Sequence, residues 1–298
     1  MRALYSGISR GSETLVFRGE VPASQRQAMR CPFQEGEFPG PVKYGYMSVG
    51  RVETGRGRAA STLEGRTVYC LHPHQDVYVV PASAVTPLPE GVPAERAVFA
   101  ANMETALNGI WDAAPGVGDR MVIVGGGVVG MLAAWLAAGV PATDVTLVDT
   151  DPSRRHVAEA LGIRFADEVP DGAGADVVIH ASGDPAGLRD ALAATGIEGR
   201  IVELSWYGSR AVSLPLGEAF HSRRITLRGS QVGRIPPDRA PRWDHARRMS
   251  LALRLLDDPA LDVIVTGESP FEELPSVMER LARDGTGTLC HRIRYAPG

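Results

Sequence analysis

Residues 122–134 read VIVGGGVVGMLAA, and this stretch decides the fold of the chain. Gly125, Gly127 and Gly130, with Val129 among them, form a G-x-G-x-x-G pattern between a strand-like apolar run and a helix-like one. In that context the glycines permit a tight turn, close approach of the backbone to a pyrophosphate, and close packing of helix on strand. The N-terminus of the helix also attracts phosphate. We therefore expect a dinucleotide-binding loop rather than a glycine-rich turn without a ligand.

An acidic residue follows this loop at the distance that a ribose ligand requires. The run TLVD ends a second expected strand at Asp149, 24 residues after Gly125. A carboxylate there accepts hydrogen bonds from the adenosine ribose and repels a 2′-phosphate, which favours NAD(H). Arg154 and Arg155 lie a few residues further on, and either side chain has the length to reach a 2′-phosphate. NADP(H) therefore stays possible.

The chain changes character near residue 105. Before it, short β-branched runs broken by Gly and Pro, such as RTVYCLH (66–72) and VYVVPA (77–82), predict a small β-rich domain. Beyond it, strand and helix patterns alternate, which is typical of βαβ units with a parallel sheet. Asp151 and Pro152 suit the N-cap and first position of one such helix. From about residue 234 the pattern becomes a Pro-rich link followed by helix, strand, helix and a closing strand.

Composition excludes several classes of protein. The chain has 298 residues, a net charge of -4 and a pI near 6.0, and it lacks the basic clusters of nucleic-acid binding proteins. Its start has no apolar signal segment, and the longest apolar run, MLAAWLAAGV, is too short to span a bilayer. Its three cysteines are widely spaced, which suits a reducing compartment. We expect a cytoplasmic protein with a small-molecule substrate and no nucleic-acid or membrane partner.

With these parts in place, the chain resembles the medium-chain dehydrogenase/reductase superfamily, the alcohol-dehydrogenase-like group. The segments that carry the resemblance are SGISRGSE (6–13) for the family's GICxxD, GYMSVG (45–50) for its GHExxG, LEGRTVY (63–69) for its GDRV strand, and METALN (103–108). The resemblance implies an α/β fold in which residues 1–105 and 234–298 form a GroES-like catalytic domain. Residues 106–233 would form an inserted Rossmann domain with a doubly wound parallel sheet. The chain begins at what resembles the family's second strand, so we expect the opening hairpin to be missing.

The resemblance also assigns further contacts and a homodimer. Arg10 matches the family arginine that contacts the cofactor pyrophosphate, and Thr105 matches the threonine that touches the nicotinamide. Ser205 and Trp206 end an expected strand on the nicotinamide side, where Trp206 is either a wall of the substrate pocket or ordinary core. Family members associate through edge strands of the Rossmann domain, so ITLRGSQVG (225–233) is the expected dimer edge.

The family's zinc ligands are replaced in this sequence. Ser9 stands in place of the first cysteine ligand, Tyr46 in place of the histidine and Met47 in place of the glutamate. The position of the third ligand falls at Ala101, or at Asn102 if the register slips by one. These side chains do not suit zinc, which prefers thiolate, imidazole or carboxylate. We predict no metal here and expect Ser9 to line the substrate pocket.

Without zinc, another group must handle the proton of the substrate oxygen. His72 and His74 are candidates, because an unperturbed imidazole titrates near neutrality. An acid/base role, a structural role and a metal-binding pair all stay open for them, with His72 narrowly preferred for catalysis. The phenol of Tyr46 is a third candidate, and its alternative is packing over the vacated metal position.

Together these features predict a zinc-independent, NAD(H)-linked oxidoreductase that transfers a hydride between nicotinamide and an alcohol/carbonyl substrate. The segments 6–22 and 45–52 look most like the zinc-lacking branch that includes the bacteriochlorophyllide hydroxyethyl dehydrogenase. One alternative is an NADPH-dependent quinone or enone reductase. A second, from a different class, is a non-enzymatic nucleotide-binding scaffold, and cofactor binding followed by hydride transfer would separate the three.

Overall fold

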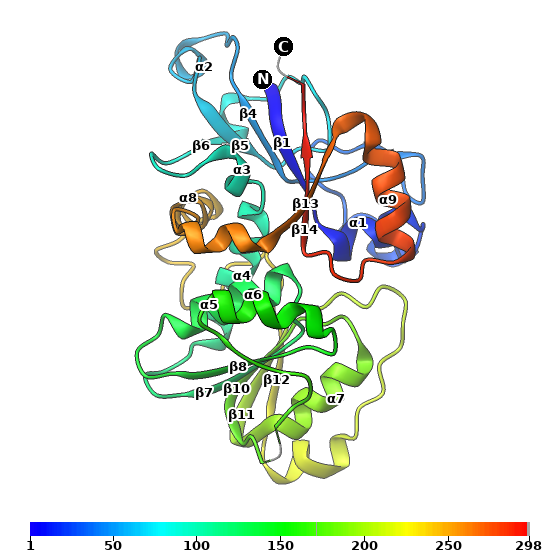
Figure 1. Ribbon diagram of the computed structural model, residues 1–298, viewed down its shortest axis with the longest axis vertical. Helices are drawn as coiled ribbons and strands as arrows, with labels where there is room; N and C mark the ends of the chain where they lie inside the picture. The colour runs from blue at the N-terminus through cyan, green and yellow to red at the C-terminus, as the bar shows by residue number, and fades with distance from the viewer. Residues whose placement is uncertain (171, 297–298) are drawn as a thin grey trace. The chain divides into compact units, whose positions relative to one another are not determined.

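The computed structural model describes residues 1–170 and 172–296 (Figure 1). Its internal contacts divide the chain into two units: Met1–Ala101 with Ala246–Gly298 forms unit 1, and Asn102–His245 forms unit 2. The domain junctions expected from the sequence, 105/106 and 233/234, both fall a little inside unit 2. The helices that begin near each junction, α4 at Ala100 and α8 at His245, cannot be located to the residue by sequence pattern.

Unit 1 is built on a mixed six-stranded sheet that joins the two ends of the chain. Its strand order is β13-β14-β1-β4-β5-β6, with β1 pairing antiparallel to both β14 and β4. In Figure 1 the blue β1 accordingly lies beside the red β14. The strands are β1 (Arg2–Ile8), β4 (Ser48–Arg51), β5 (Thr67–Cys70), β6 (Val85–Pro87), β13 (Val265–Pro270) and β14 (Cys290–Arg294), with a separate hairpin of β2 (Glu35–Gly36) and β3 (Val42–Lys43).

The core of unit 1 also draws on both ends of the chain. Apolar side chains of β1 and β14, such as Ile8 and Ile293, are almost fully buried and share a cluster with Val277 and Leu281 of helix α9. Burying each such side chain stabilises the fold by about 1.5–3 kcal/mol. The helices of this unit are α1 (Arg10–Phe17), α2 (Arg58–Ser61), α3 (Ala94–Ala97), α8 (His245–Leu255) and α9 (Leu274–Arg283).

The expectation of a strand over VYVVPA is wrong. Residues 77–80 make only an isolated bridge between Val77 and Arg2, and the sixth strand of the sheet is Val85–Pro87 instead. Tyr78 exchanges backbone hydrogen bonds with Met1 at 3.1 and 3.0 Å, which starts a ladder. In the described part of the chain no strand pairs with Val79 or Val80, and Val79 is 95% exposed. A β-branched run therefore forms no strand here.

Unit 2 contains a six-stranded, fully parallel sheet, as expected. Its order is β12-β11-β10-β7-β8-β9, which is the doubly wound order of two mononucleotide-binding halves on either side of β7 and β10. The register aligns His180 of β10 with Glu203 of β11, at the carboxyl ends of both strands. The strands are β7 (Arg120–Val124), β8 (Asp144–Val148), β9 (Arg164–Ala166), β10 (Ala175–His180), β11 (Thr195–Glu203) and β12 (Thr226–Gly229).

The helices of unit 2 follow their expected signals. Helix α5 begins directly after the glycine-rich loop and is capped by Gly139. Asp151 acts as an N-cap, because its side chain accepts a hydrogen bond from the Ser153 amide at 3.0 Å, although the first turn that it caps is 3-10 rather than α. The helices are α4 (Ala100–Ala113), α5 (Val128–Ala138), α6 (Arg155–Ala160) and α7 (Pro185–Ala194).

Two general findings concern the whole described chain. Cys31, Cys70 and Cys290 are all buried and unpaired. Within residues 1–170 and 172–296, no helix has the length and apolar character needed to cross a membrane.

Arg96 fastens helix α3 to the C-terminal part of unit 1. Its side chain is buried and donates to both carboxylate oxygens of Asp262, at 2.7 and 2.8 Å. It also donates to the backbone carbonyls of Leu256 and Asp257, each at 3.1 Å. A bidentate guanidinium–carboxylate pair of this kind gives geometric specificity as well as energy.

We expect Arg96→Met to lower the free energy of unfolding by about 2 kcal/mol, because it leaves two inward carbonyls without a donor. Urea denaturation of both proteins measures the difference. Arg2→Met is the matched control: Arg2 pairs with Glu53 on the surface, so its loss should cost under about 1 kcal/mol. Equal effects of the two substitutions would contradict a fastening role for Arg96.

Candidate functional site

The glycine-rich loop has the geometry of a dinucleotide site at each of its three glycines. A Cβ at Gly125, whose φ is +109°, would lie 2.5 Å from the Ser182 amide nitrogen, and a Cβ at Gly130 would lie 1.8 Å from the Gly125 carbonyl oxygen. A Cβ at Gly127 would meet no protein atom within 4 Å, so the space beside that residue is open. The first and third glycines are thus required by packing, and the middle one leaves room for a pyrophosphate.

The N-terminus of α5 suits the phosphates of that ligand. Gly127 is the N-cap and supplies no side-chain hydrogen bond to the first turn. The amide N–H groups of the first turn, which include that of Val129, have no intrahelical partner by the geometry of a helix. Together with the helix dipole they form an anion site. The residues of this loop therefore fit a dinucleotide cofactor.

Asp149 lies directly beside the loop. Its carboxylate accepts hydrogen bonds from the amide of Gly126 at 2.6 Å and from the amide of Asp151 at 2.8 Å. The two arginines that follow differ in placement. Arg154 is buried, with its Cβ on the Gly126 side of the loop, whereas Arg155 pairs with Asp167 at 2.9 Å and lies over Phe165. Of the two, only Arg154 is placed next to Asp149.

The other predicted cofactor contacts have protein partners. Arg10 donates to the carbonyl of Gly285 at 2.7 Å. Thr105 is half-buried within α4. The Ser205 amide donates to Glu203 at 2.6 Å, and its hydroxyl accepts from the Gly183 amide at 3.0 Å and contacts Nδ1 of His180 at 3.1 Å. Trp206, next to it, is 37% exposed.

The positions of the family's zinc ligands hold a hydroxyl pair. The phenol of Tyr46 donates to the Ser9 hydroxyl at 2.7 Å, so the resemblance correctly brings these two positions together. Met47 is packed in the core and Ala101 offers no side-chain ligand. Among the described residues, no group of three or more His, Cys, Asp or Glu side chains is placed to hold a metal. A serine and a neutral tyrosine do not fit zinc.

The Tyr46 phenol is held in its neutral form. Burial, together with the negative charge of Glu13, raises the pKa of Tyr46 to about 12 despite hydrogen bonds to Ser12 and Ser9. At neutral pH this side chain is therefore a proton donor and not a phenolate.

His74 forms a buried hydrogen-bond network with Glu13, a residue that the sequence did not indicate. Nε2 of His74 lies 2.9 Å from a Glu13 oxygen, and Nδ1 lies 2.7 Å from the Ser6 hydroxyl. The second Glu13 oxygen accepts from the Ser9 amide at 2.7 Å, and Tyr295 contacts Ser6 at 2.9 Å. A chain of contacts thus runs from Tyr46 through residue 9 and Glu13 to His74.

A pocket of about 490 Å³ lies on the surface of unit 1 beside this network. Glu13 and His74 line it together with apolar side chains of α1 and α9, such as Val16 and Met278. The close approach of the His74 ring depends on Gly45, because a Cβ there would lie 3.0 Å from the ring. The imidazole–carboxylate pair therefore has one side in the core and one side at a pocket.

His72 lies in a different environment. Its ring stacks on Tyr78 with centroids 3.6 Å apart and on Phe33 at 5.4 Å, and Nδ1 contacts the Pro73 carbonyl. Burial lowers the pKa of His72 in spite of that hydrogen bond. The geometry favours packing for His72, while His74 holds the contacts expected of a proton-handling group.

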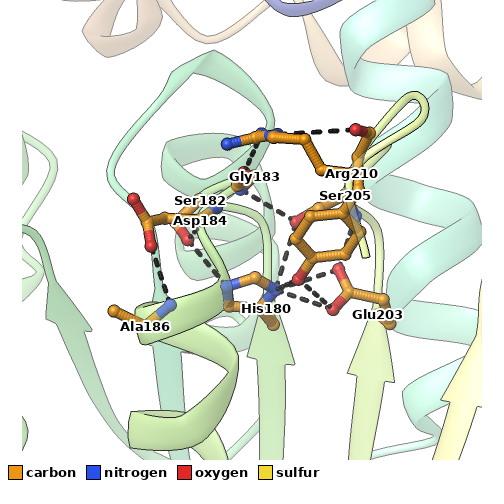
Figure 2. Close-up of polar contacts among 9 residues, drawn as sticks. His180, Ser182, Gly183, Asp184, Ala186, Glu203, Ser205 and Arg210 are labelled. Carbon is orange, nitrogen blue, oxygen red and sulfur yellow. Dashed lines mark hydrogen bonds and ion pairs between the residues drawn. The ribbon is translucent and has the colours of Figure 1, made fainter. Parts of the chain in front are cut away.

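A second polar cluster, in unit 2, was not expected from the sequence. His180, fully buried at the end of β10, contacts both oxygens of Glu203 through Nδ1, at 2.9 and 2.8 Å, and the hydroxyl of Ser182 through Nε2, at 2.7 Å (Figure 2). Tyr207 donates to Glu203 at 2.9 Å. The available signal was the presence of polar residues at the ends of two apolar strands, in VVIHAS and IVELS.

A family model described as zinc-binding dehydrogenase matches residues 128–247 of this chain. An uncharacterised zinc-type alcohol dehydrogenase-like protein of Escherichia coli K12, YphC, is 30% identical over 58% of this chain and 51% of its own length. The D-guloside 3-dehydrogenase of the same organism is 30% identical over 54% of this chain and 49% of its own length. The chain thus spans about half the length of these curated relatives.

Solved structures resemble the chain over nearly its whole length. An L-idonate 5-dehydrogenase from Escherichia coli superposes with a TM-score of 0.76 at 18% identity, covering 98% of this chain and 90% of that one. An alcohol dehydrogenase from Escherichia coli CFT073 in complex with NADH superposes with a TM-score of 0.75 at 16% sequence identity, with the same coverage of both chains. A putative zinc-binding dehydrogenase of Sinorhizobium meliloti bound to NADP superposes with a TM-score of 0.75 at 20% sequence identity. It covers 98% of this chain and 90% of that one. These likenesses confirm the expected fold, a GroES-like mixed sheet with a Rossmann sheet.

Proposed function

We propose that the chain is a member of the medium-chain, zinc-type alcohol dehydrogenase superfamily and an NAD(H)-linked oxidoreductase acting on an alcohol/carbonyl pair, supported by the family model, the relatives and the fold. The observation that supports the proposal is the loop of Gly125, Gly127 and Gly130, which leaves open space at Gly127 and has Asp149 beside it. When bound, the nicotinamide supplies or accepts the hydride.

We further propose that the reaction does not use zinc. The support is the chemistry of the residues at the ligand positions, where Ser9 and Tyr46 satisfy each other. The relatives named above give no support to the branch that includes the bacteriochlorophyllide hydroxyethyl dehydrogenase, so the substrate is assigned no more narrowly than an alcohol or its carbonyl.

In this proposal the Tyr46 phenol and the His74–Glu13 pair share the work on the proton. Tyr46, neutral at pH 7, exchanges its hydrogen bond to Ser9 for one to the oxygen of a carbonyl substrate. Glu13 anchors the Ser9 backbone on one side and His74 on the other. His74, which lines the pocket, is the group that handles the proton.

The preference for NAD(H) tests the cofactor part of the proposal. We expect tight binding of NADH and weak binding of NADPH in fluorescence titrations of the purified protein. Asp149→Asn removes the charge and one hydrogen-bond acceptor. It should weaken NADH binding about 10- to 100-fold, the value of hydrogen bonds to a charged group. The difference between the dissociation constants for NADH and NADPH should become smaller.

Asp167→Asn is the matched control, because Asp167 lies on the surface after β9 and contacts Arg155. It should leave both affinities unchanged. A preference of the wild type for NADPH would favour the enone-reductase alternative and direct attention to Arg154. Binding of neither cofactor would leave the scaffold alternative.

Substitutions of His74 and His72 distinguish a catalytic role from a packing role. With the best substrate from a screen of alcohols and ketones, His74→Asn should lower kcat about 10²- to 10⁴-fold, the usual value of a positioned acid or base, without changing the affinity for NADH. His72→Asn should instead lower the melting temperature, because it disrupts the stack on Tyr78. Normal turnover by the His74 variant would show that the proton is handled elsewhere.

We also propose that the chain forms a homodimer through β12. In the described part of the chain this strand pairs only with β11, and all four of its residues are exposed, Leu227 at 36%. Unpaired edge strands are ready sites for strand addition.

Sedimentation velocity of the wild type should therefore give a dimer, and Leu227→Lys should shift it toward monomer. Val117→Lys, at a loop residue that is 74% exposed, is the control and should leave the dimer intact. A monomeric wild type would contradict this part of the proposal.

A further inference from the structure

The carboxyl ends of β10 and β11 hold a closed set of hydrogen bonds around one imidazole and one carboxylate. His180 contacts Glu203 through Nδ1 and Ser182 through Nε2 (Figure 2). Glu203 also accepts from the Ser205 amide at 2.6 Å and from the Tyr207 phenol. The pair thereby fastens the two loops that follow these strands, because Ser182 belongs to one and Ser205 and Tyr207 belong to the other.

The hydrogen bonds identify Glu203 as the negatively charged member of this set. Nδ1 of His180 faces the Glu203 carboxylate. An ionised carboxylate only accepts hydrogen bonds, so this ring nitrogen is the donor. Ser182 accepts from the Asp184 amide at 3.1 Å and contacts Nε2. Nδ1 of His180, the Ser205 amide and the Tyr207 phenol all converge on Glu203, as suits an ionised carboxylate. The nearby cation Arg210 contacts the Gly183 carbonyl and not the carboxylate.

This negative charge lies beside the cofactor loop. The backbone of Ser182 approaches Gly125 so closely that a Cβ there would be 2.5 Å from its nitrogen. Strands β7 and β10 are neighbours at which the strand order reverses, and dinucleotides bind across the carboxyl edge at such a point. Asp149, on β8, lies in the first mononucleotide-binding half, so the half built by β10 and β11 takes the nicotinamide nucleotide.

The same three residues resemble a Ser–His–carboxylate triad in their distances. The packing argues against a nucleophile, because a Cβ on Gly187 of α7 would lie 2.6 Å from the Ser182 oxygen and 2.9 Å from Nε2. The hydroxyl is therefore pressed against the helix, and the Asp184 amide already donates to it.

We propose that Glu203, oriented by His180, is a positioning residue that favours the oxidised, positively charged nicotinamide over the reduced, neutral one in this site. This inference rests on the proposed function, since it requires NAD(H) to bind. The charge is available at neutral pH: burial alone would raise the pKa of Glu203, but hydrogen bonds and charge from His180, with the Ser205 contacts, hold it below its ordinary value.

The test is the ratio of the dissociation constants for NAD⁺ and NADH, measured by calorimetry at pH 7 in wild type, Glu203→Gln and Tyr207→Phe. Glu203→Gln keeps the shape and removes the charge. It should raise the ratio of Kd for NAD⁺ to Kd for NADH about tenfold, as expected for a unit charge acting over several ångströms in a protein. Tyr207→Phe removes one hydrogen bond and no charge, so its ratio should equal that of the wild type.

Each other outcome overturns the inference. If Glu203→Gln weakened the binding of NAD⁺ and NADH equally, the His180–Glu203 pair would be purely structural. The same conclusion would follow if Glu203→Gln and Tyr207→Phe had the same effect. A Glu203 variant that no longer folds is covered by His180→Gln, which should lower the affinity for NAD⁺ more than for NADH if the orientation of Glu203 matters. Labelling of Ser182 by a fluorophosphonate would replace the positioning role with a nucleophile. Failure of the wild type to bind either cofactor would overturn the proposed function as well, whereas binding with an unchanged ratio in Glu203→Gln overturns only this inference.

Discussion

The contact on which the candidate cofactor site depends is the close approach of Gly130 in α5 to the carbonyl of Gly125 at the end of β7. No side chain fits there, since a Cβ would lie 1.8 Å from that oxygen. This contact holds α5 close against β7, so that the first turn of α5 lies at the open space beside Gly127. The same turn brings the end of β10 against Gly125, so the loop and the His180 cluster are parts of one edge of the sheet. A parallel sheet makes this possible because all its strands end on the same side.

The loop could be predicted from the sequence because everything that defines it is local. Gly125, Gly130 and Asp149 lie within one βαβ unit, and the strand and helix periods on either side agree with them. Ser9 and Tyr46 are 37 residues apart in the chain. Their proximity in the fold could be predicted only from the resemblance to a family. The strand expected over residues 77–82 failed for the opposite reason. Its β-branched composition is local, but a strand needs a partner, and the pairing of this run in the described chain stops at Tyr78.

The polar partners that decide the chemistry are not local, which is why the sequence did not indicate them. Glu13 and His74 are separated by 61 positions and His180 and Glu203 by 23. Before the fold is known, Glu13 is one of 35 acidic residues in the chain. His74 and His72 flank the same proline, and what sets the His74 ring beside Glu13 includes the glycine at position 45 that admits it. Burial converts such a pair from a surface contact into a constraint, because a buried charge without a partner is costly.

On our proposals, the imidazole–carboxylate pair of each unit and Tyr46 have separate roles in a reaction that does not use zinc. A metal lowers the pKa of a substrate hydroxyl, whereas the burial of Tyr46 raises the pKa of its phenol to about 12 and keeps it a donor. A donor of that kind serves carbonyl reduction, and alcohol oxidation needs a base, for which the imidazole of His74 beside Glu13 is the available group. A charge at Glu203 that stabilises bound NAD⁺ over bound NADH would shift the equilibrium on the enzyme toward NAD⁺ and alcohol. On our proposals, Glu203 and the Tyr46 donor therefore both favour carbonyl reduction, and His74 supplies the base for the reverse step.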